Sequence, residues 1–321
     1  MKSDTAHLAL IIASFLAADA LAAPRVVVSI PPIASLVDGV LGGADVSRTV
    51  VPPGASLHSF ALKPSDAEAL QSADVVFWVG PSLETFLEKP IANLGAGAEI
   101  VALMEAPGVN VLKGREGGVW DSDADAEDHG DEADHHDEDH DHDHDEHDHS
   151  VDGHLWLDPT NARAMVAAIR DAMIKADAPN AATYTANAAA FSARIDALDG
   201  ELSTLLKPVA RKPFIVFHDG YQYLEKRYGL NAAGSITVSP DRPPGAGRIA
   251  EIKAAIEDRG AMCVFAEPQF EPKLVATLIE GTPARTATLD PEGASLKAGP
   301  DLYFELMRAL GKNLSDCLAG G

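Results

Sequence analysis

Two stretches of the chain carry the same succession of strand and helix signals, and this internal repeat constrains the fold more than any other feature. Each copy begins with a buried strand run and a helical pattern, and continues with a strand that opens into a loop rich in Pro and Gly. A helix leading into a strand follows, and then a last short strand. The paired segments are 24–43 with 212–229, 47–60 with 232–247, 63–80 with 247–268, and 98–108 with 284–293. This alternation predicts two Rossmann-like α/β lobes with mainly parallel sheets.

A long segment between the two copies has the composition of one helix. From Asn180 to Lys207 it is rich in Ala and Leu, free of proline, and bounded by Pro179 and Pro208. The pattern predicts a helix of up to ~28 residues, about 40 Å long, which would join the lobes rigidly. A flexible linker would be rich in Gly and Ser instead. The predicted parts are an N-terminal lobe over 24–178, a linking helix over 179–207 and a C-terminal lobe over 208–321.

An acidic, histidine-rich tract interrupts the N-terminal lobe. Residues 121–152 contain 17 Asp and Glu and no Lys or Arg, so they account for most of the net charge of -24. The tract has almost no apolar side chains to bury and cannot offset the entropy lost on ordering, which predicts a disordered loop over 117–152. The acidity is therefore local, and the chain lacks the clustered Lys and Arg that a nucleic-acid partner would require.

The first 23 residues have the pattern of a secretory signal peptide. Lys2 precedes an apolar run over residues 8–18, and small residues place cleavage after Ala22 or Ala23. The apolar run is shorter than the ~20 residues that span a bilayer, which disfavours a membrane anchor. We therefore predict export, with a mature protein in the periplasm.

Two cysteines, Cys263 and Cys317, remain in the predicted mature chain. In an oxidising compartment such a pair is expected to form a disulfide, and two buried free thiols are the alternative. No CxxC redox motif is present.

All three histidines outside the tract and the signal peptide occupy the same kind of place in the predicted fold. His58 lies in a loop after a strand, His154 follows the tract, and His218 directly follows the strand FIVF; Asp290 follows the strand TATL. Each alone has an ordinary interpretation as a loop, core, capping or turn residue. Because ligands of α/β folds bind beyond the carboxyl ends of the strands, their common placement predicts one metal site in the cleft between the lobes.

Three imidazoles and one carboxylate form a ligand set that suits Zn²⁺. Such a set holds zinc in near-tetrahedral geometry, with Zn–N distances of ~2.0–2.1 Å. Harder ions such as Mn²⁺ favour more carboxylate, so the third imidazole, from His218, favours zinc.

Five segments together carry a specific resemblance to a known family. They read VVPPGASLHSFALKPSDAEALQSADVVFWVGPSLETFL, HLWLDP, FHDGYQYLEKRYGL, CVFAEPQF and TLDPEG. In these segments, and over essentially the whole mature chain, the sequence resembles the periplasmic zinc-binding proteins of bacterial zinc ABC importers, the ZnuA type of the cluster A-I metal solute-binding proteins.

The resemblance implies a metal site and a role. His58, His154 and His218 would be the three imidazole ligands, and Asp290 would face the fourth position, shared with water. The chain would be a monomeric binding protein, not an enzyme. It would deliver Zn²⁺, its transported ligand, to an inner-membrane ABC permease with a cytoplasmic ATPase.

The resemblance also implies a disulfide between Cys263 and Cys317. The chain departs from the family at one position that bears on the site. Some relatives carry Glu just before the first ligand histidine, where this chain has Leu57. We therefore expect no carboxylate ligand from that position.

The composition of the tract predicts additional metal sites that bind more weakly than the cleft site. Exposed imidazoles among carboxylates should hold several ions loosely and exchange them fast, because a loop without structure must be ordered on binding. Such a tract could capture zinc and pass it to the cleft, or sense the abundance of zinc in the periplasm, and a solvated acidic spacer is the alternative. The predicted auxiliary ligands are His129, His135, His136, His140, His142, His144, His147 and His149.

Three alternative functions compete with zinc transport. A zinc hydrolase would also use three histidines and an open position, but an HExxH motif is absent and Glu267 is the only candidate base. The binding protein of a manganese or iron importer would share the fold. A surface adhesin or metal buffer would need a lipid-anchor cysteine, and none follows the signal peptide.

Overall fold

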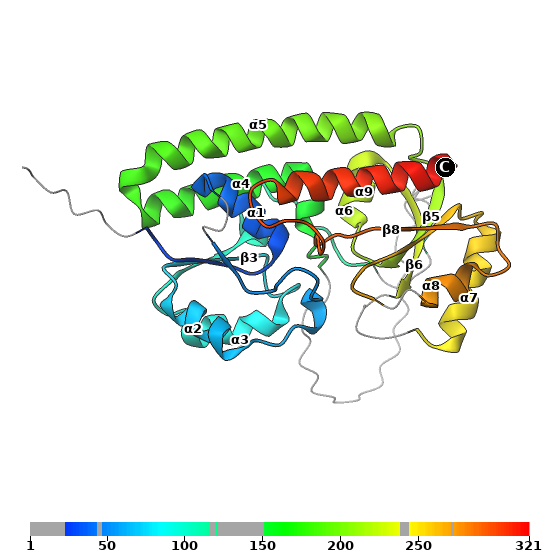
Figure 1. Cartoon of the computed structure of the whole chain (residues 1–321), viewed down its shortest axis with the longest axis horizontal. Coiled ribbons are helices and arrows are strands. Elements are labelled where there is room, and N and C mark those ends of the chain that lie inside the picture. The colour runs from blue at the N-terminus through cyan, green and yellow to red at the C-terminus, as the bar shows by residue number, and fades with distance from the viewer. Residues whose placement is uncertain are drawn as a thin grey trace, which may run out of the picture.

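The computed structural model describes residues 23–43, 47–115, 120, 151–237, 244–270 and 273–320 (Figure 1). The predicted signal peptide, apart from its last residue, lies outside these ranges. So do all eight histidines of the tract and most of the predicted loop over 117–152.

Two four-stranded parallel sheets form the two lobes. The first contains β1 (Val26–Val28), β2 (Arg48–Thr49), β3 (Val75–Trp78) and β4 (Glu99–Ala102), in the order β2-β1-β3-β4. The second contains β5 (Pro213–His218), β6 (Asn231–Thr237), β7 (Cys263–Ala266) and β8 (Arg285–Thr288), in the order β6-β5-β7-β8. Each sheet thus orders its strands in the same way along its half of the chain. The predicted repeat and the predicted parallel α/β lobes are confirmed.

Helices cover both faces of each sheet, because both faces of these strands are apolar. In the first lobe Val27 and Val76 point toward α2 (Pro64–Ser72) and α3 (Thr85–Leu94), and the alternate residues join the core around α1 (Pro31–Leu41) and α4 (Pro159–Ala176). In the second lobe α7 (Ala246–Asp258) and α8 (Lys273–Ile279) cover the outer face. The helix α6 (Gln222–Tyr228) follows β5.

The predicted linking helix is present as α5 (Ala181–Leu206), 26 residues long. It runs along one side of both lobes (Figure 1). Its buried residues recur every three or four positions and so form one apolar stripe; they are Tyr184, Ala188, Phe191, Ile195, Leu198, Leu202 and Leu206. The stripe packs against α4, α1 and the last helix. The helix is therefore held along its length by packing, as a rigid connection requires.

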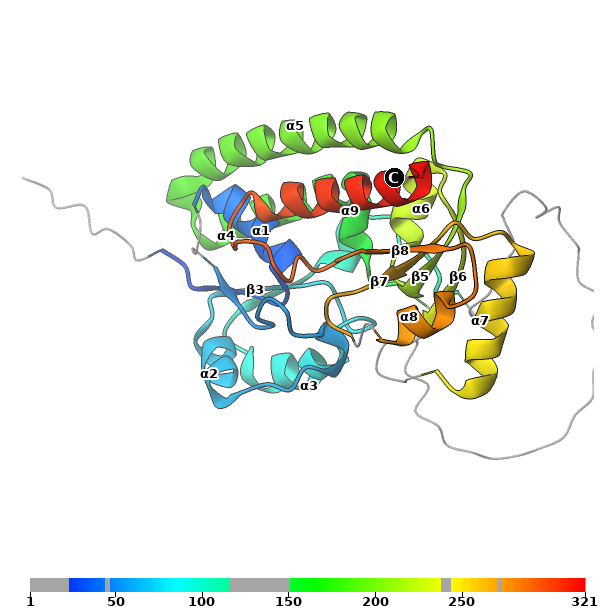
Figure 2. The ribbon, with the colours of Figure 1, turned by 45° about the vertical axis from the view of Figure 1, so that its right-hand side comes forward.

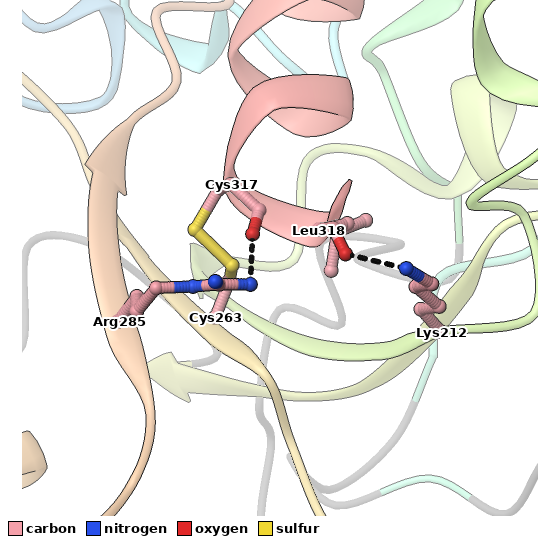
Figure 3. The surroundings of a disulfide bond; sticks show 5 residues. All are labelled: Lys212, Cys263, Arg285, Cys317 and Leu318. Carbon is pink, nitrogen blue, oxygen red and sulfur yellow. Dashed lines mark hydrogen bonds between the residues drawn. A yellow bond between two sulfur atoms is a disulfide. The ribbon is translucent and has the colours of Figure 1, made fainter. Parts of the chain in front are cut away.

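The last helix, α9 (Leu302–Ala319), lies beside α5 and reaches from one lobe to the other (Figures 1 and 2). It packs against α1 at one end, where the Tyr303 backbone N–H donates to Ser35 Oγ at 3.0 Å. At its other end a disulfide joins Cys317 to Cys263 of β7 (Figure 3). Arg285 and Lys212 donate to the carbonyls of Cys317 and Leu318 there. The predicted disulfide is confirmed, and it fastens α9 to the second sheet.

No helix in the described part of the chain is both long enough and apolar enough to cross a membrane.

Candidate metal centre

His58 comes from a short 3-10 turn, Leu57–Ser59, that follows β2. Ser56 caps this turn by accepting the backbone N–H of His58, and Leu57 is fully buried beneath it. The ring nitrogen Nε2 of His58 is buried and has no hydrogen-bond partner among the residues that the structure describes. Leaving a buried polar nitrogen without a partner is costly, which points to a ligand at this atom.

His154 lies where the chain returns from the tract, just before the 3-10 turn Leu155–Leu157. Oδ1 of Asp152 accepts its backbone N–H at 3.0 Å and lies 2.8 Å from its ring Nδ1. A carboxylate oxygen can only accept, so Nδ1 donates here and Nε2 is the ring nitrogen left to bind a metal. The next aromatic residue, Trp156, donates from its indole N–H to the Pro291 carbonyl at 2.8 Å, which ties this turn to the second lobe.

His218 is the last residue of β5 and is almost fully buried. Its Nδ1 lies 2.7 and 2.9 Å from the two carboxylate oxygens of Glu267, which follows β7. The Tyr221 hydroxyl donates to the same carboxylate at 3.1 Å. Glu267 is therefore engaged in orienting His218, and it is not a free base as a hydrolase would require.

The three imidazoles converge between the lobes. Their ring centroids are 5.1 to 5.7 Å apart, and one ligand atom from each lies within 4.8 Å of the others. Nε2 of His154 and Nε2 of His218 are 3.2 Å apart. Two nitrogens bound tetrahedrally to one Zn²⁺ would be ~3.3 Å apart, given Zn–N of ~2.0–2.1 Å. His154 and His218 therefore have the spacing of two ligands on one zinc ion, and a ring nitrogen of His58 lies within 4.8 Å of both.

Carboxylates hold two of these rings from behind, as metal-bound histidines require. A carboxylate on Nδ1 fixes the ring orientation and raises the basicity of Nε2 toward a metal. Neither Asp152 nor Glu267 was among the predicted site residues. Asp152 had been counted with the charges of the tract, although its place two residues before His154 is a local signal. Glu267 is 49 residues from its partner His218, so only the fold reveals the pair.

Gly220 closes one side of the cluster, and sequence reasoning missed it as well. A Cβ at this residue would lie 2.5 Å from Nε2 of His218 and 3.0 Å from Nε2 of His154. Any side chain here would occupy the space beside the two ligand atoms. The signal in the sequence is the triplet His218–Asp219–Gly220, in which a glycine closely follows a ligand.

Burial and neighbouring charges shift the pKa values of His58 and His218 in opposite directions. Burial lowers the pKa of His58 well below its ordinary value, and the charges of His218 and His154 lower it further. Burial also acts to lower the pKa of His218, but the charge and hydrogen bond of Glu267 outweigh it and raise the pKa. His58 is thus held neutral, in the form that binds a metal.

Asp290 lies after β8 on the same side of the second sheet, but its oxygens have other partners. Oδ1 accepts the backbone N–H groups of Glu292 and Gly293, Oδ2 accepts that of Ala294, and Gln269 donates to Oδ1. The cluster formed by the described residues contains the three histidines without Asp290. Its role as the fourth ligand stays a prediction.

Two α/β lobes that share a cluster of three histidines, two of them buried and one half-buried, define a two-lobed metal-binding protein. Comparison with known proteins narrows this class. The family model of the zinc-uptake complex component A, periplasmic, matches residues 26–317. The chain belongs to this family, the ZnuA family, whose members are transport components and not enzymes.

Curated relatives support the same family over nearly the full length. The high-affinity zinc uptake system protein ZnuA of Brucella suis is 53% identical over 309 residues, covering 92% of this chain and 91% of the relative. The protein of the same name from Paracoccus denitrificans is 41% identical over 299 residues, covering 92% of each.

Solved structures share the fold. A crystal structure of ZnuA has a TM-score of 0.73 at 23% identity, covering 92% of this chain and 99% of that one. A mutant structure of the laminin-binding adhesin Lmb from Streptococcus agalactiae has a TM-score of 0.72 at 24% identity, with the same coverage. Because one fold occurs under both descriptions, it is the sequence relatives and the family model that identify the family.

Proposed function

We propose that this chain captures Zn²⁺ between its two lobes and delivers it to an inner-membrane ABC permease powered by a cytoplasmic ATPase. The observation that carries this proposal is the convergence of three imidazoles between the lobes, with Nε2 of His154 and of His218 3.2 Å apart. The names of the curated relatives, high-affinity zinc uptake proteins, support zinc as the transported ligand.

The three ligand atoms would come from His58, His154 and His218. The Nδ1 atoms of His154 and His218 face carboxylates, which leaves Nε2 of each ring to bind one shared ion, and such nitrogen ligands suit a borderline ion such as Zn²⁺. The fourth ligand would be a water or an oxygen of Asp290, which would have to leave its backbone partners to reach the metal.

Manganese and iron are the alternatives to zinc as the transported ion. A site with three imidazole ligands favours zinc, since Mn²⁺ prefers oxygen ligands. Titration of the zinc-loaded protein with Mn²⁺ or Fe²⁺ should leave zinc in place at a large excess of either ion. Displacement by a few equivalents would favour the manganese or iron importer instead.

Export and oligomeric state belong to the same proposal. Residues 1–23 would be removed on export, leaving a monomer whose lobes, 24–178 and 208–321, flank the linking helix over 179–207. The intact mass of protein recovered from the periplasm tests the cleavage, and sedimentation tests the monomer. A mass that still includes residues 1–23 would contradict the first point.

The eight histidines of the tract would act as auxiliary, weaker ligands that collect zinc near the cleft. Deleting residues 121–150 should remove the weak sites and leave one tight site. If the tight site is lost on deletion, the tract is the principal binder.

Calorimetric titration with chelator competition tests the assignment of the three histidines. His58→Ala, His154→Ala and His218→Ala combined should abolish the tight site, because each removes one ligand. The matched control replaces three tract histidines, His140, His142 and His144, by Ala, and should keep the tight site. Survival of tight binding in the first triple variant would overturn the proposal.

A further inference from the structure

Arg115 reaches across from the first lobe to two buried carboxylates of the second. Its Nε lies 3.1 Å from both oxygens of Asp219, and its Nη2 also donates to Asp219. Its Nη1 and Nη2 donate to the two oxygens of Glu225 at 2.7 and 3.0 Å. The side chain of Arg115 is 21% exposed, and those of both acids are 8% exposed. Paired bonds of this kind fix orientation as well as distance.

The position of Asp219 gives these bonds their significance. It lies in the turn between His218, which ends β5, and Gly220, whose N–H donates back to the His218 carbonyl at 2.9 Å. Gly220 in turn lies against Nε2 of both His218 and His154. Rotation of this turn would move a ligand histidine and the backbone that bounds the cluster. Arg115 therefore holds the turn at its middle residue.

Contacts other than those with the two acids also restrict the Arg115 side chain and its segment. Its guanidinium carbon lies 3.6 Å from the centroid of the Trp120 ring, and the Trp120 backbone N–H donates to the carbonyl of Ala233 in β6. Two residues before it, Lys113 pairs with Val151 across the base of the tract. The arginine is thus held by the Trp120 ring and by the nearby Lys113–Val151 bridge in addition to its bonds with the two acids.

The same region also contacts the second ligand. The Tyr223 hydroxyl donates to the Asp152 carbonyl at 2.8 Å and accepts the Leu112 N–H at 2.9 Å. Asp152 orients His154 through its side chain. The segment that carries Arg115 and the α6 region that Arg115 binds are therefore joined to His154 as well as to His218.

We propose that Arg115 is a positioning residue for the zinc site, whose two paired interactions hold the His218–Gly220 turn where His218 and His154 can share one ion. This inference rests on the proposed function. Arg115 does not contact the metal and acts through Asp219.

A purely electrostatic role of Arg115 and a positioning role predict different zinc affinities for the Arg115 variants, which makes the inference testable. If Arg115 acted only as a positive charge, Arg115→Gln would tighten zinc binding and Arg115→Lys would leave it unchanged. If it positions the turn, both variants should weaken zinc binding by about 10-fold or more, since lysine keeps the charge and loses the planar fork.

The matched control is Arg248, at the start of α7. Its side chain is 20% exposed, close to the 21% of Arg115, but it donates to the carbonyl of Ser235 and to Glu251 instead of to the turn. Arg248→Lys and Arg248→Gln therefore change an arginine of similar exposure with other partners. Thermal unfolding of all four variants separates loss of stability from loss of affinity.

The experiment measures zinc affinity by chelator competition on the full mature protein, with the visible spectrum of the Co²⁺-loaded protein as a report of ligand geometry. We expect weaker zinc binding and a changed Co²⁺ spectrum in both Arg115 variants, and neither effect in the Arg248 variants. Unchanged affinity and spectrum in Arg115→Lys would overturn the inference, even if Arg115→Gln does not fold.

Failure of the proposed function has a separate signature. If the combined His58, His154 and His218 variant binds zinc as tightly as the wild type, the zinc site itself lies elsewhere, and Arg115 has no site to position.

Discussion

His154 and His218 each have a carboxylate behind the ring, whereas His58 is held by burial and by the turn that carries it. A ring that is already oriented loses little conformational entropy when it binds a metal. The site therefore has the features of tight, selective binding, and Glu267 serves this role because both of its oxygens contact His218.

Gly220→Ala should weaken zinc binding about 10- to 100-fold. The added methyl would lie 2.5 Å from Nε2 of His218, and the ring cannot move aside without breaking its contact with Glu267. Chelator competition measures the loss. Gly200→Ala, where a Cβ has nothing within 4 Å, is the matched control and should bind zinc like the wild type. Equal zinc affinity of Gly220→Ala and Gly200→Ala would show that the His218–Gly220 turn accommodates a methyl group without displacing the ligand rings.

Glu84 provides a test of pH dependence at a group that is not one of the three histidines. It is fully buried, and burial raises its pKa from 4.5 to about 7, despite the bond that its carboxylate accepts from the Gly80 N–H at 3.0 Å. A raised pKa in the folded state contributes stability that is present below pH 4.5 and is lost as the pH rises through about 7. The loss is about 3 kcal/mol at most.

Glu84→Gln removes this titration. The variant should therefore gain stability relative to the wild type as the pH rises from 5 to 8, measured by urea unfolding at both values. Glu257→Gln, at an exposed position on α7, is the control. A difference between Glu84→Gln and the wild type that does not change with pH would contradict the raised pKa.

At the scale of elements, the periodicity of the sequence predicted the features that depend on local sequence, namely the linking helix and the repeated strands. The helix predicted from Asn180 to Lys207 is Ala181–Leu206 in the structure, because prolines bound it and its apolar residues share one face. The repeat predicted the shared strand order, and the three histidines were found because strand ends converge in parallel sheets. Glu267 and Arg115 could not be found in this way, since their partners His218 and Asp219 are distant in the sequence. Asp152 and Gly220 lie two residues from a ligand histidine, but their roles depend on side-chain direction and on the space beside the ligand atoms.

Gly200→Ala should stabilise the protein by about 0.5–1 kcal/mol. Gly200 lies inside α5 at an exposed position with open space around its Cα, so alanine adds helix propensity without a clash. Thermal unfolding measures the gain. No gain, or a loss, would mean that α5 does not continue as a regular helix through this residue.

At the scale of the molecule, α5 and α9 lie side by side across both lobes, and one hydrophobic core contains strand residues of both sheets. Such a body favours small local shifts on zinc loading over a large hinge rotation. The disulfide and the hydrogen bonds from Lys212 and Arg285 attach the end of α9 to the second lobe (Figure 3).

Replacing Cys263 and Cys317 together by Ala should lower stability by about 2–4 kcal/mol, because the bond closes a segment with a sequence separation of 54. Urea unfolding measures the change. The wild type treated with reductant should show a similar loss, and an unchanged midpoint in both would contradict the role of the disulfide.

The central claim is that three histidines from two lobes hold one zinc ion. X-ray absorption at the zinc edge of the mature protein, loaded with one equivalent of zinc, tests it most directly. We expect three nitrogen ligands from imidazoles at ~2.0–2.1 Å and one oxygen, with the pattern lost in the variant lacking His58, His154 and His218. The same spectrum in the wild type and in that variant would contradict the claim and place the ion elsewhere.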